Sequence, residues 1–288
     1  MLWGQFGDNS ALNNFGQLRF QRSYPDPLLG YNGAMCLIVF AWQSHPDYPL
    51  ILAANRDEYY RRPTALADFW EDQPNILGGR DLSGGGTWLS LNRSGRLAAV
   101  TNYREASESQ APRSRGELTT NFLNNDLNIS TYAQQAMNNG HQYSGFNLLL
   151  NEGDQLLYCS NRQAEIQQLP PGVYTLSNHL LNSPWPKAVH TKKAFEQCIS
   201  EKSVSSDQLA QCLHRRTPFP DEFLPNTGVS LELERMLSPP FIVSKEYGTR
   251  CTSIVLKNHQ KGTLFVEQTY ETDGSPGEQR EFSINSDQ

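Results

Sequence analysis

The 288-residue sequence lacks the features of a membrane, secreted or nucleic-acid-binding protein. Its longest apolar run spans residues 35–42, far below the ~18 residues needed to cross a bilayer. Residues 1–34 contain no charged segment followed by an apolar segment and a small-residue cleavage site, so they predict no secretory signal. With 24 basic and 30 acidic residues, the net charge is −6, which provides no basic field for a phosphate backbone. We therefore expect a cytoplasmic protein with no transmembrane segment and no nucleic-acid partner.

Cysteine is scarce and widely spaced. The chain has five cysteines, at positions 36, 159, 198, 212 and 251. They form no CxxC pair, and no histidine lies near them at the spacing of a zinc site. The pattern therefore predicts neither a disulfide framework nor a metal site.

Charged residues (19%) and hydrophobic residues (38%) are both somewhat low in number. Asn, Gln, Ser and Thr fill the difference, which is typical of a loop-rich folded chain rather than a disordered one. Residues 1–34 show no periodicity of two or 3.6 residues, so we interpret them as a loose N-terminal extension. The periodic remainder, residues 35–288, is expected to form a single domain.

Strand patterns and helix patterns follow one another in blocks along this domain. Two hairpins are expected, over 36–42 with 49–54 and over 87–91 with 96–102. Helical spacing covers 116–127, 131–138, 186–200 and 207–214, with Ser130 as a candidate N-cap. Short strands are expected at 146–150, 155–160, 164–168 and 173–176, as an antiparallel meander, and at 252–257 and 263–268. Blocks of this kind predict an α+β fold rather than a doubly wound βαβ order.

Reactive and charged side chains concentrate near the ends of these strands. Cys36 opens the first strand directly after a methionine, although an ordinary buried cysteine explains it equally well. Residues 55–58 (Asn-Arg-Asp-Glu) need partners beside a core strand, although a solvated strand end is the common alternative. The glycine-rich residues 78–88 are expected to form a loop that approaches a ligand, but they contain no nucleotide-binding pattern.

These segments resemble the motifs of the NRDE family, which is also called the transport and Golgi organisation protein 2 family. The resemblance extends from residue 35 to about residue 268. The matching segments are MCLIVF (35–40), ANRDE (54–58), GGRD (78–81), GTWL (86–89), TNYR (101–104), SN (177–178) and GTR (248–250).

The resemblance implies a fold and a reaction. The NRDE family is similar to the N-terminal-nucleophile hydrolases, particularly the penicillin V acylase and bile salt hydrolase group. A four-layer αββα sandwich with two mainly antiparallel sheets is therefore expected. The implied activity is hydrolysis of a linear amide C–N bond in a small-molecule amide or acyl conjugate.

The resemblance also implies roles for individual residues. Cys36 would be the nucleophile, with its own α-amino group as the base. Arg56 would lower the pKa of the thiol, and Asp57 would orient the amine. Asn102 and Asn178 would donate to the developing oxyanion. Arg250 is a weaker candidate for a second cation at the site.

The position of Cys36 in the chain departs from the family pattern. In the family the cysteine follows the initiator methionine, whereas here 34 residues precede Met35. Either Met35 is the true start, or the extension is a pro-segment that must be cut before Cys36. We favour a start at Met35 because the extension has no pattern that would dock it. While Cys36 lies in an internal peptide bond, the α-amine does not exist and this mechanism cannot operate.

A non-catalytic carrier of haem or of a lipid or acyl ligand is the alternative, as is a family role in Golgi organisation and protein secretion. Trp88, Tyr103 and Trp185, with Trp70, would line its groove, although core packing explains each of them separately. Carried haem would need Cys36 or His179 as an axial ligand, and no resident cofactor is expected. A third interpretation is a scaffold that acts only through its surface.

Overall fold

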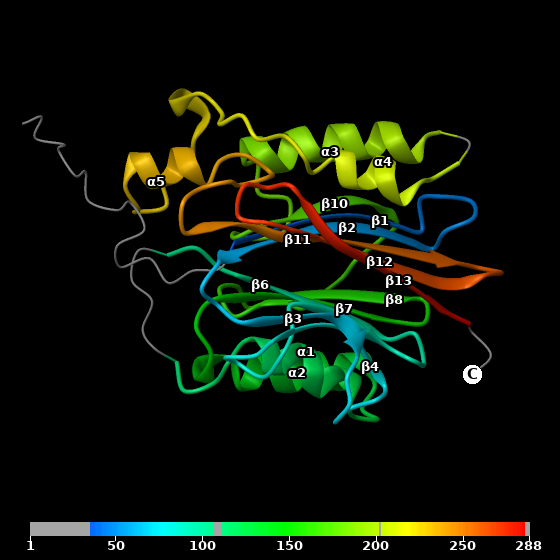
Figure 1. Ribbon diagram of the computed structural model, residues 1–288. Coiled ribbons are helices and arrows are strands. Elements are labelled where there is room, and N and C mark those ends of the chain that lie inside the picture. The colour runs from blue at the N-terminus through cyan, green and yellow to red at the C-terminus, as the bar shows by residue number, and fades with distance from the viewer. Residues whose placement is uncertain (1–34, 106–110, 202, 286–288) are drawn as a thin grey trace, which may run out of the picture.

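The computed structural model describes residues 35–105, 111–201 and 203–285. The predicted extension, residues 1–34, lies outside the described residues. Two antiparallel sheets stack face to face, with helices on both outer faces (Figure 1).

The first sheet has six strands. In spatial order they are β10 (Gly172–Leu176), β1 (Met35–Trp42), β2 (Leu50–Tyr59), β11 (Tyr247–Asn258), β12 (Gly262–Tyr270) and β13 (Pro276–Ile284). The second sheet has seven strands. In spatial order they are β3 (Thr64–Phe69), β4 (Ile76–Asp81), β5 (Leu89–Asn92), β6 (Leu97–Asn102), β7 (Phe146–Glu152), β8 (Gln155–Ser160) and β9 (Gln167–Gln168).

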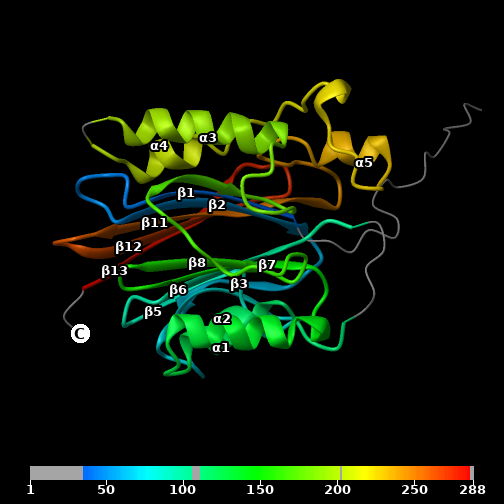
Figure 2. The same ribbon diagram turned by 180° about the vertical axis from the view of Figure 1, so that it is seen from behind.

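Helices cover the outer face of each sheet, as the view from behind also shows (Figure 2). The seven-stranded sheet carries α1 (Gly116–Leu123) and α2 (Ile129–Asn138), followed by the 3-10 turn η1 (Gly140–Gln142). The six-stranded sheet carries α3 (Pro186–Ile199) and α4 (Ser206–Gln211). The turn η2 (Asp221–Phe223) and α5 (Leu231–Met236) follow along the chain.

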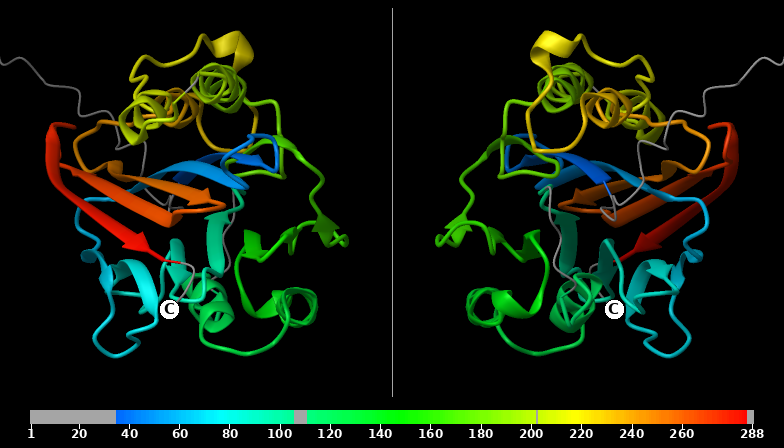
Figure 3. Two further views of the ribbon diagram at one scale, coloured as in Figure 1. Left: turned by 90° about the vertical axis from the view of Figure 1, so that its right-hand side faces the viewer. Right: turned by 90° about the vertical axis from the view of Figure 1, so that its left-hand side faces the viewer.

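Side-chain alternation along β1 explains this layering. Ile38, Phe40 and Trp42 belong to the core between the two sheets, whereas Leu37 and Val39 pack with the residues of α3 and α4. Successive residues of a strand point to opposite faces, so a strand that is apolar at every position is buried on both faces. Seen end-on, the four layers lie in the order α, β, β, α (Figure 3). The predicted four-layer αββα sandwich is confirmed.

Both predicted hairpins form, but the first is longer than expected. β1 pairs with β2 from Met35–Asp57 to Trp42–Leu50, and β5 pairs with β6. The second strand was expected to end at residue 54 with a solvated end as one alternative, but β2 continues to Tyr59 with every residue buried. The strand continues because β11 pairs along it on its second edge and supplies polar partners.

The prediction that the glycine-rich residues 78–81 belong to a loop is wrong, since these residues form part of β4. A Cβ atom on Gly79 would lie 2.2 Å from Cη2 of Trp88. Glycine therefore lets the indole ring lie directly against the strand. The signal for β4 was hidden because glycine is rare in strands.

The expected four-strand meander divides between the two sheets. β7, β8 and β9 are neighbours in the seven-stranded sheet, but β10 pairs with β1 in the other sheet. The N-cap of α2 is Asn128 rather than Ser130, because the Asn128 side chain accepts from the N–H of Thr131 at 2.8 Å. The sequence did not indicate β3, α5 or β13.

Candidate active site

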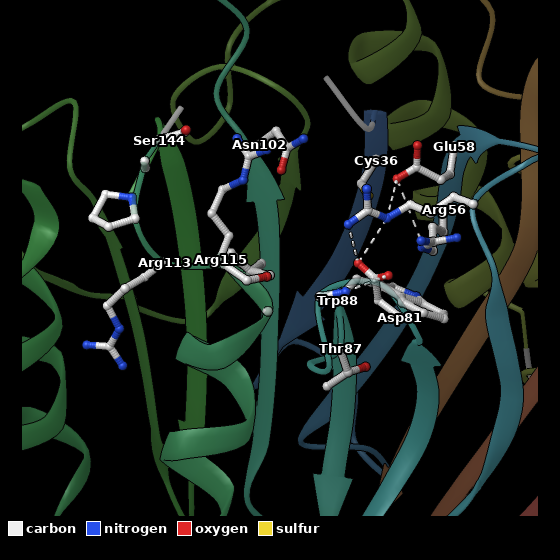
Figure 4. A pocket seen from close by; sticks show the side chains of 17 residues that line it. Cys36, Arg56, Glu58, Asp81, Thr87, Trp88, Asn102, Arg113, Arg115 and Ser144 are labelled. Carbon is white, nitrogen blue, oxygen red and sulfur yellow. Dashed lines mark hydrogen bonds and ion pairs between the residues drawn. The ribbon is translucent and has the colours of Figure 1, made fainter. Parts of the chain in front are cut away.

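Cys36 lies near the beginning of β1, on the face turned toward the second sheet. Its side chain lines a cavity of about 350 Å³, although only 6% of the residue is exposed. The cavity walls come from β2, β4, β6 and the segment that leads into α1 (Figure 4). Six charged side chains line it, and they are Arg56, Glu58, Arg62, Asp81, Arg113 and Arg115.

Arg56 is the direct register partner of Cys36 on β2. Its guanidinium carbon lies 4.4 Å from the ring centroid of Trp88, and one of its nitrogens lies 3.7 Å from a carboxylate oxygen of Glu58. Arg62 continues this chain of charges, since it lies 3.6 Å from Glu58 and 2.7 Å from Asp81. The network holds the Arg56 side chain at the position opposite Cys36.

Burial dominates the chemistry of the thiol while Cys36 lies within the chain. Desolvation, together with the charges of Asp57 and Glu58, raises the pKa of Cys36 to about 12 against the opposing effect of Arg56. The thiol is therefore protonated near neutral pH. The nearby arginine alone does not make it a thiolate, so a base must take its proton.

Asp57 lies next to this position on β2, opposite Met35. Its Oδ1 accepts from the hydroxyl of Thr249 at 2.7 Å, and its fully buried Oδ2 has no hydrogen-bond partner among the described residues. Burial raises the pKa of Asp57 to about 6, opposed mainly by the charge of Lys187. An unpartnered carboxylate oxygen can accept a hydrogen bond from an amine at the N-terminus of Cys36.

Asp57→Asn should remove one pH dependence of stability. The folded state raises the pKa of Asp57 from 3.8 to about 6, so the folded chain holds this proton more tightly than the unfolded chain. Its stabilising contribution is complete below pH ~4 and is lost as pH rises through ~6. In urea unfolding of the chain that keeps Met35, wild type should lose about 2–3 kcal/mol relative to the variant between these pH values. Parallel pH profiles would contradict the assignment.

Asn178 joins Cys36 to Asn102. Its Oδ1 lies 3.4 Å from the backbone N of Cys36, and its Nδ2 donates to the backbone carbonyl of Asn102 at 3.0 Å. The side chain of Asn102 lines the Cys36 cavity, and its buried Nδ2 has no hydrogen-bond partner among the described residues. Among the described residues the donor of Asn102 is therefore unengaged, while Nδ2 of Asn178 holds the backbone of Asn102.

The remaining predicted site residues lie outside the cavity lining, except Trp88. Nη1 of Arg250 donates to the carbonyls of Tyr59 and Arg62 at 3.0 and 3.1 Å, so it holds the turn that carries Arg62. Tyr103 packs against His179 at a centroid distance of 4.9 Å, and the guanidinium of Arg104 lies over Trp185. The predicted groove thus does not unite its aromatic residues at the thiol.

Sequence reasoning missed several charged residues near Cys36. Glu58 was part of a recognised motif, yet its pairing with Arg62 has no sequence signal. Lys187 is buried in α3, where burial lowers its pKa to about 8 against the raising effect of Asp57. Arg104 and Glu234 form a buried ion pair at 2.5 Å, 130 positions apart. Only the folded chain brings such distant residues together.

Two further findings concern the described residues as a set. They contain no group of three or more His, Cys, Asp or Glu side chains placed to hold a metal ion. None of their helices is both long and apolar enough to span a membrane.

Comparison with solved structures finds chains that are similar over most of their length. One is the Caenorhabditis elegans ortholog of N-acylethanolamine-hydrolyzing acid amidase, with a TM-score of 0.44 and 9% identity over 77% of this chain and 92% of that chain. Another is a mutant conjugated bile acid hydrolase from Clostridium perfringens, with a TM-score of 0.48 and 10% identity over 87% of this chain and 97% of that chain.

Curated relatives are similar along almost their whole length. The Transport and Golgi organization 2 homolog of Mus musculus is 35% identical over 82% of this chain and 93% of the relative. The Homo sapiens homolog is 36% identical over 88% of this chain and 100% of the relative, and the Drosophila melanogaster protein is 29% identical over 88% and 98%. The family described as Transport and Golgi organisation 2 matches residues 35–272. The chain therefore belongs to the Transport and Golgi organisation 2 family.

Proposed function

We propose that this protein, when its chain begins at Cys36, is an N-terminal-nucleophile amidohydrolase that cleaves the C–N bond of a linear amide. The observation that carries the proposal concerns Asn102, which lines the cavity with Cys36 and whose buried Nδ2 has no hydrogen-bond partner in the part of the chain that the structure describes. A buried donor without a partner is costly unless it serves a ligand or a transition state. An oxyanion formed by attack of the Cys36 thiol is such a partner.

The first half of the reaction uses the new N-terminus as base. The α-amine of Cys36, with an ordinary pKa of about 7.7–8.0, takes the thiol proton while Sγ attacks the substrate carbonyl carbon. The carbonyl oxygen becomes an oxyanion beside Nδ2 of Asn102. Asp57 Oδ2 and Asn178 Oδ1 are acceptors that would orient the amine, and Arg56 would favour the thiolate.

The second half releases the products. The protonated α-amine gives its proton to the leaving nitrogen, so the C–N bond breaks and an acyl thioester remains on Cys36. Water, deprotonated by the same amine, then attacks the thioester and frees the carboxylic acid. No proton-transfer step needs a histidine.

The test compares two chains that differ by one residue. One begins at Cys36 and the other keeps Met35, and both are assayed against a panel of N-acyl amides and anilides. Because only the first has an α-amine on Cys36, we expect turnover by the first chain alone. Equal rates for the two chains, or no turnover of any panel member by the first, would refute the proposal.

Asn102→Ala should lower kcat by about 10²-fold or more, because one oxyanion donor is lost. KM should change little, since the donor acts mainly on the transition state. Asn102→Asp provides the matched variant, because it keeps the side-chain shape and the backbone carbonyl that Asn178 binds but removes the donor. Steady-state kinetics of both variants in the Cys36-initiated chain check this. Unchanged kcat in Asn102→Asp would remove Asn102 from the mechanism.

The carrier of haem, lipid or acyl ligand and the role in Golgi organisation stay predictions. The cavity beside Cys36 is lined by six charged side chains and does not include Tyr103, Trp185 or His179. This lining favours a polar amide near the thiol over an apolar cargo.

A further inference from the structure

Met35 fills a space at the end of the six-stranded sheet, on the opposite face of β1 from Cys36. Its residue is fully buried and packs in an apolar cluster with α5 and β11. The other buried members of the cluster are Tyr59, Leu233, Leu237, Ile242 and Tyr247. The backbone N–H of Met35 donates to the hydroxyl of Tyr247 at 2.7 Å. Met35 thus occupies a fitted, mostly apolar space that adjoins the nucleophile along the chain, on the other face of the strand.

The far end of this space is polar. Nη2 of Arg104 lies 3.3 Å from the sulfur of Met35, and Nη1 pairs with Glu234. The Arg104 side chain is 2% exposed, and its Nε has no hydrogen-bond partner among the described residues. A thioether sulfur is a weak acceptor, so a group that accepts more strongly would bind this guanidinium better.

Each of the two cations near the space occupied by Met35 has a carboxylate that opposes its charge. Arg104 is paired with Glu234 at 2.5 Å, and the charge of Lys187 is opposed by Asp57. While the α-amine of Cys36 is in the neutral form that acts as the base, an additional buried charge would have no counter-ion, and burying an uncompensated charge is costly. An uncharged occupant is therefore favoured.

We propose that the space filled by Met35 is a substrate subsite that opens when the chain begins at Cys36. It takes a short, unbranched and uncharged arm of the substrate whose far end carries a hydrogen-bond acceptor. Its location follows from the covalent chain, because Met35 directly precedes the residue whose amine and thiol would act on the substrate. The inference rests on the proposed function and names the part of the substrate that this side of the site selects.

The test measures binding without catalysis. Cys36→Ala is introduced into a chain that begins at residue 36 and into the same chain with Met35 retained. Calorimetry measures the binding of five probes to each chain. The probes are the N-acetyl amides of norleucine, methionine, methionine sulfoxide, isoleucine and lysine. We expect saturable binding only to the shorter chain. The sulfoxide probe should bind at least about 3-fold more tightly than the norleucine probe. The isoleucine and lysine probes should bind about 10-fold more weakly than the methionine probe.

Arg104→Lys keeps a cation for Glu234 but shortens the reach toward the space. In the shorter chain this variant should bind norleucine as before and lose the preference for the sulfoxide. Equal binding to both chains, or no binding to the shorter one, would overturn the subsite. Because the probes are not hydrolysed, binding without turnover in the Cys36 chain would refute only the proposed function. Turnover without probe binding would refute only the subsite.

A separate observation concerns two cysteines on the outer helices. Sγ of Cys198 in α3 lies 3.0 Å from Sγ of Cys212, which directly follows α4. Cys212 is buried and Cys198 is partly exposed. The two cysteines are 14 positions apart in the sequence, which does not indicate that they meet. The packing of α3 against α4 brings their thiols together.

We further infer that this pair is a site of reversible thiol oxidation. With hydrogen peroxide, the two thiols lose two protons and two electrons to form one S–S bond, and the peroxide is reduced to two waters. Intact mass should fall by about 2 Da and return with dithiothreitol, while Cys198→Ser shows no such change and Cys159→Ser still does. Full alkylation of both thiols after peroxide treatment, or the same mass loss in Cys198→Ser, would overturn this inference.

Discussion

Cys36→Ala, in a chain that begins at residue 36, is expected to lower kcat/KM for any responsive amide by more than about 10⁴-fold. The substitution removes the only atom that forms the acyl thioester, and removal of a nucleophile costs more than removal of an orienting group. The α-amine, Asn102 and the cavity remain, so substrate should still bind. Single-turnover and steady-state kinetics with the substrate found by the amide panel measure the loss.

Cys159→Ala is the matched control, because Cys159 is buried between the seven-stranded sheet and its helices, away from the cavity. This variant should keep its rate within about 2-fold, since Cys159 itself does not line the cavity and the substitution removes only one buried sulfur. A Cys36→Ala variant that retains wild-type turnover would exclude Cys36 as the nucleophile, whatever the control does.

Arg104→Met is expected to reduce the free energy of unfolding by about 3–5 kcal/mol, because it leaves the carboxylate of Glu234 buried without its cation. Glu234 is 3% exposed, and Thr227, which donates to its Oε1 through both its backbone N–H and its hydroxyl, is no substitute for a cation. Chemical denaturation at pH 7 measures the loss. The apolar replacement is similar in length, so packing changes contribute less than the unpaired charge.

The double variant Arg104→Met with Glu234→Gln separates charge from packing. It should recover at least about half of the loss, because a neutral amide is cheaper to bury than a carboxylate. If the double variant is as unstable as Arg104→Met alone, the ion pair is not the cause of the stability.

The central strands were predictable because their residues are apolar on both faces. The runs over β1 and β2 have no other explanation in a chain of this composition, and the family motifs placed Cys36, Arg56 and Asn102 at one cavity. The strand β4 was hidden because Gly79 makes room for Trp88. A close approach between segments is a property of the packed structure rather than of the local sequence.

The electrostatic side of the site was less predictable. The sequence marked Asp57 as a charged residue, but it does not show that Oδ2 lacks a hydrogen-bond partner among the described residues, or that the charge of the distant Lys187 lowers the pKa of this carboxyl. Asn178 was predicted to donate to the oxyanion and Arg250 to be a second cation at the site, whereas Nδ2 of Asn178 and Nη1 of Arg250 donate to backbone carbonyls. Motif matching finds residues that belong to a site, but hydrogen-bond geometry assigns which atoms remain available.

The most direct test of the account is the intact mass of the Cys36-initiated chain shortly after it is mixed with an activated N-acyl anilide. The account predicts an increase equal to the acyl group, carried by the peptide that contains Cys36 and removed by hydroxylamine. The chain that keeps Met35 should show no adduct. Turnover of the anilide with no acyl adduct on Cys36, or an adduct of equal yield in the Met35 chain, would contradict the mechanism.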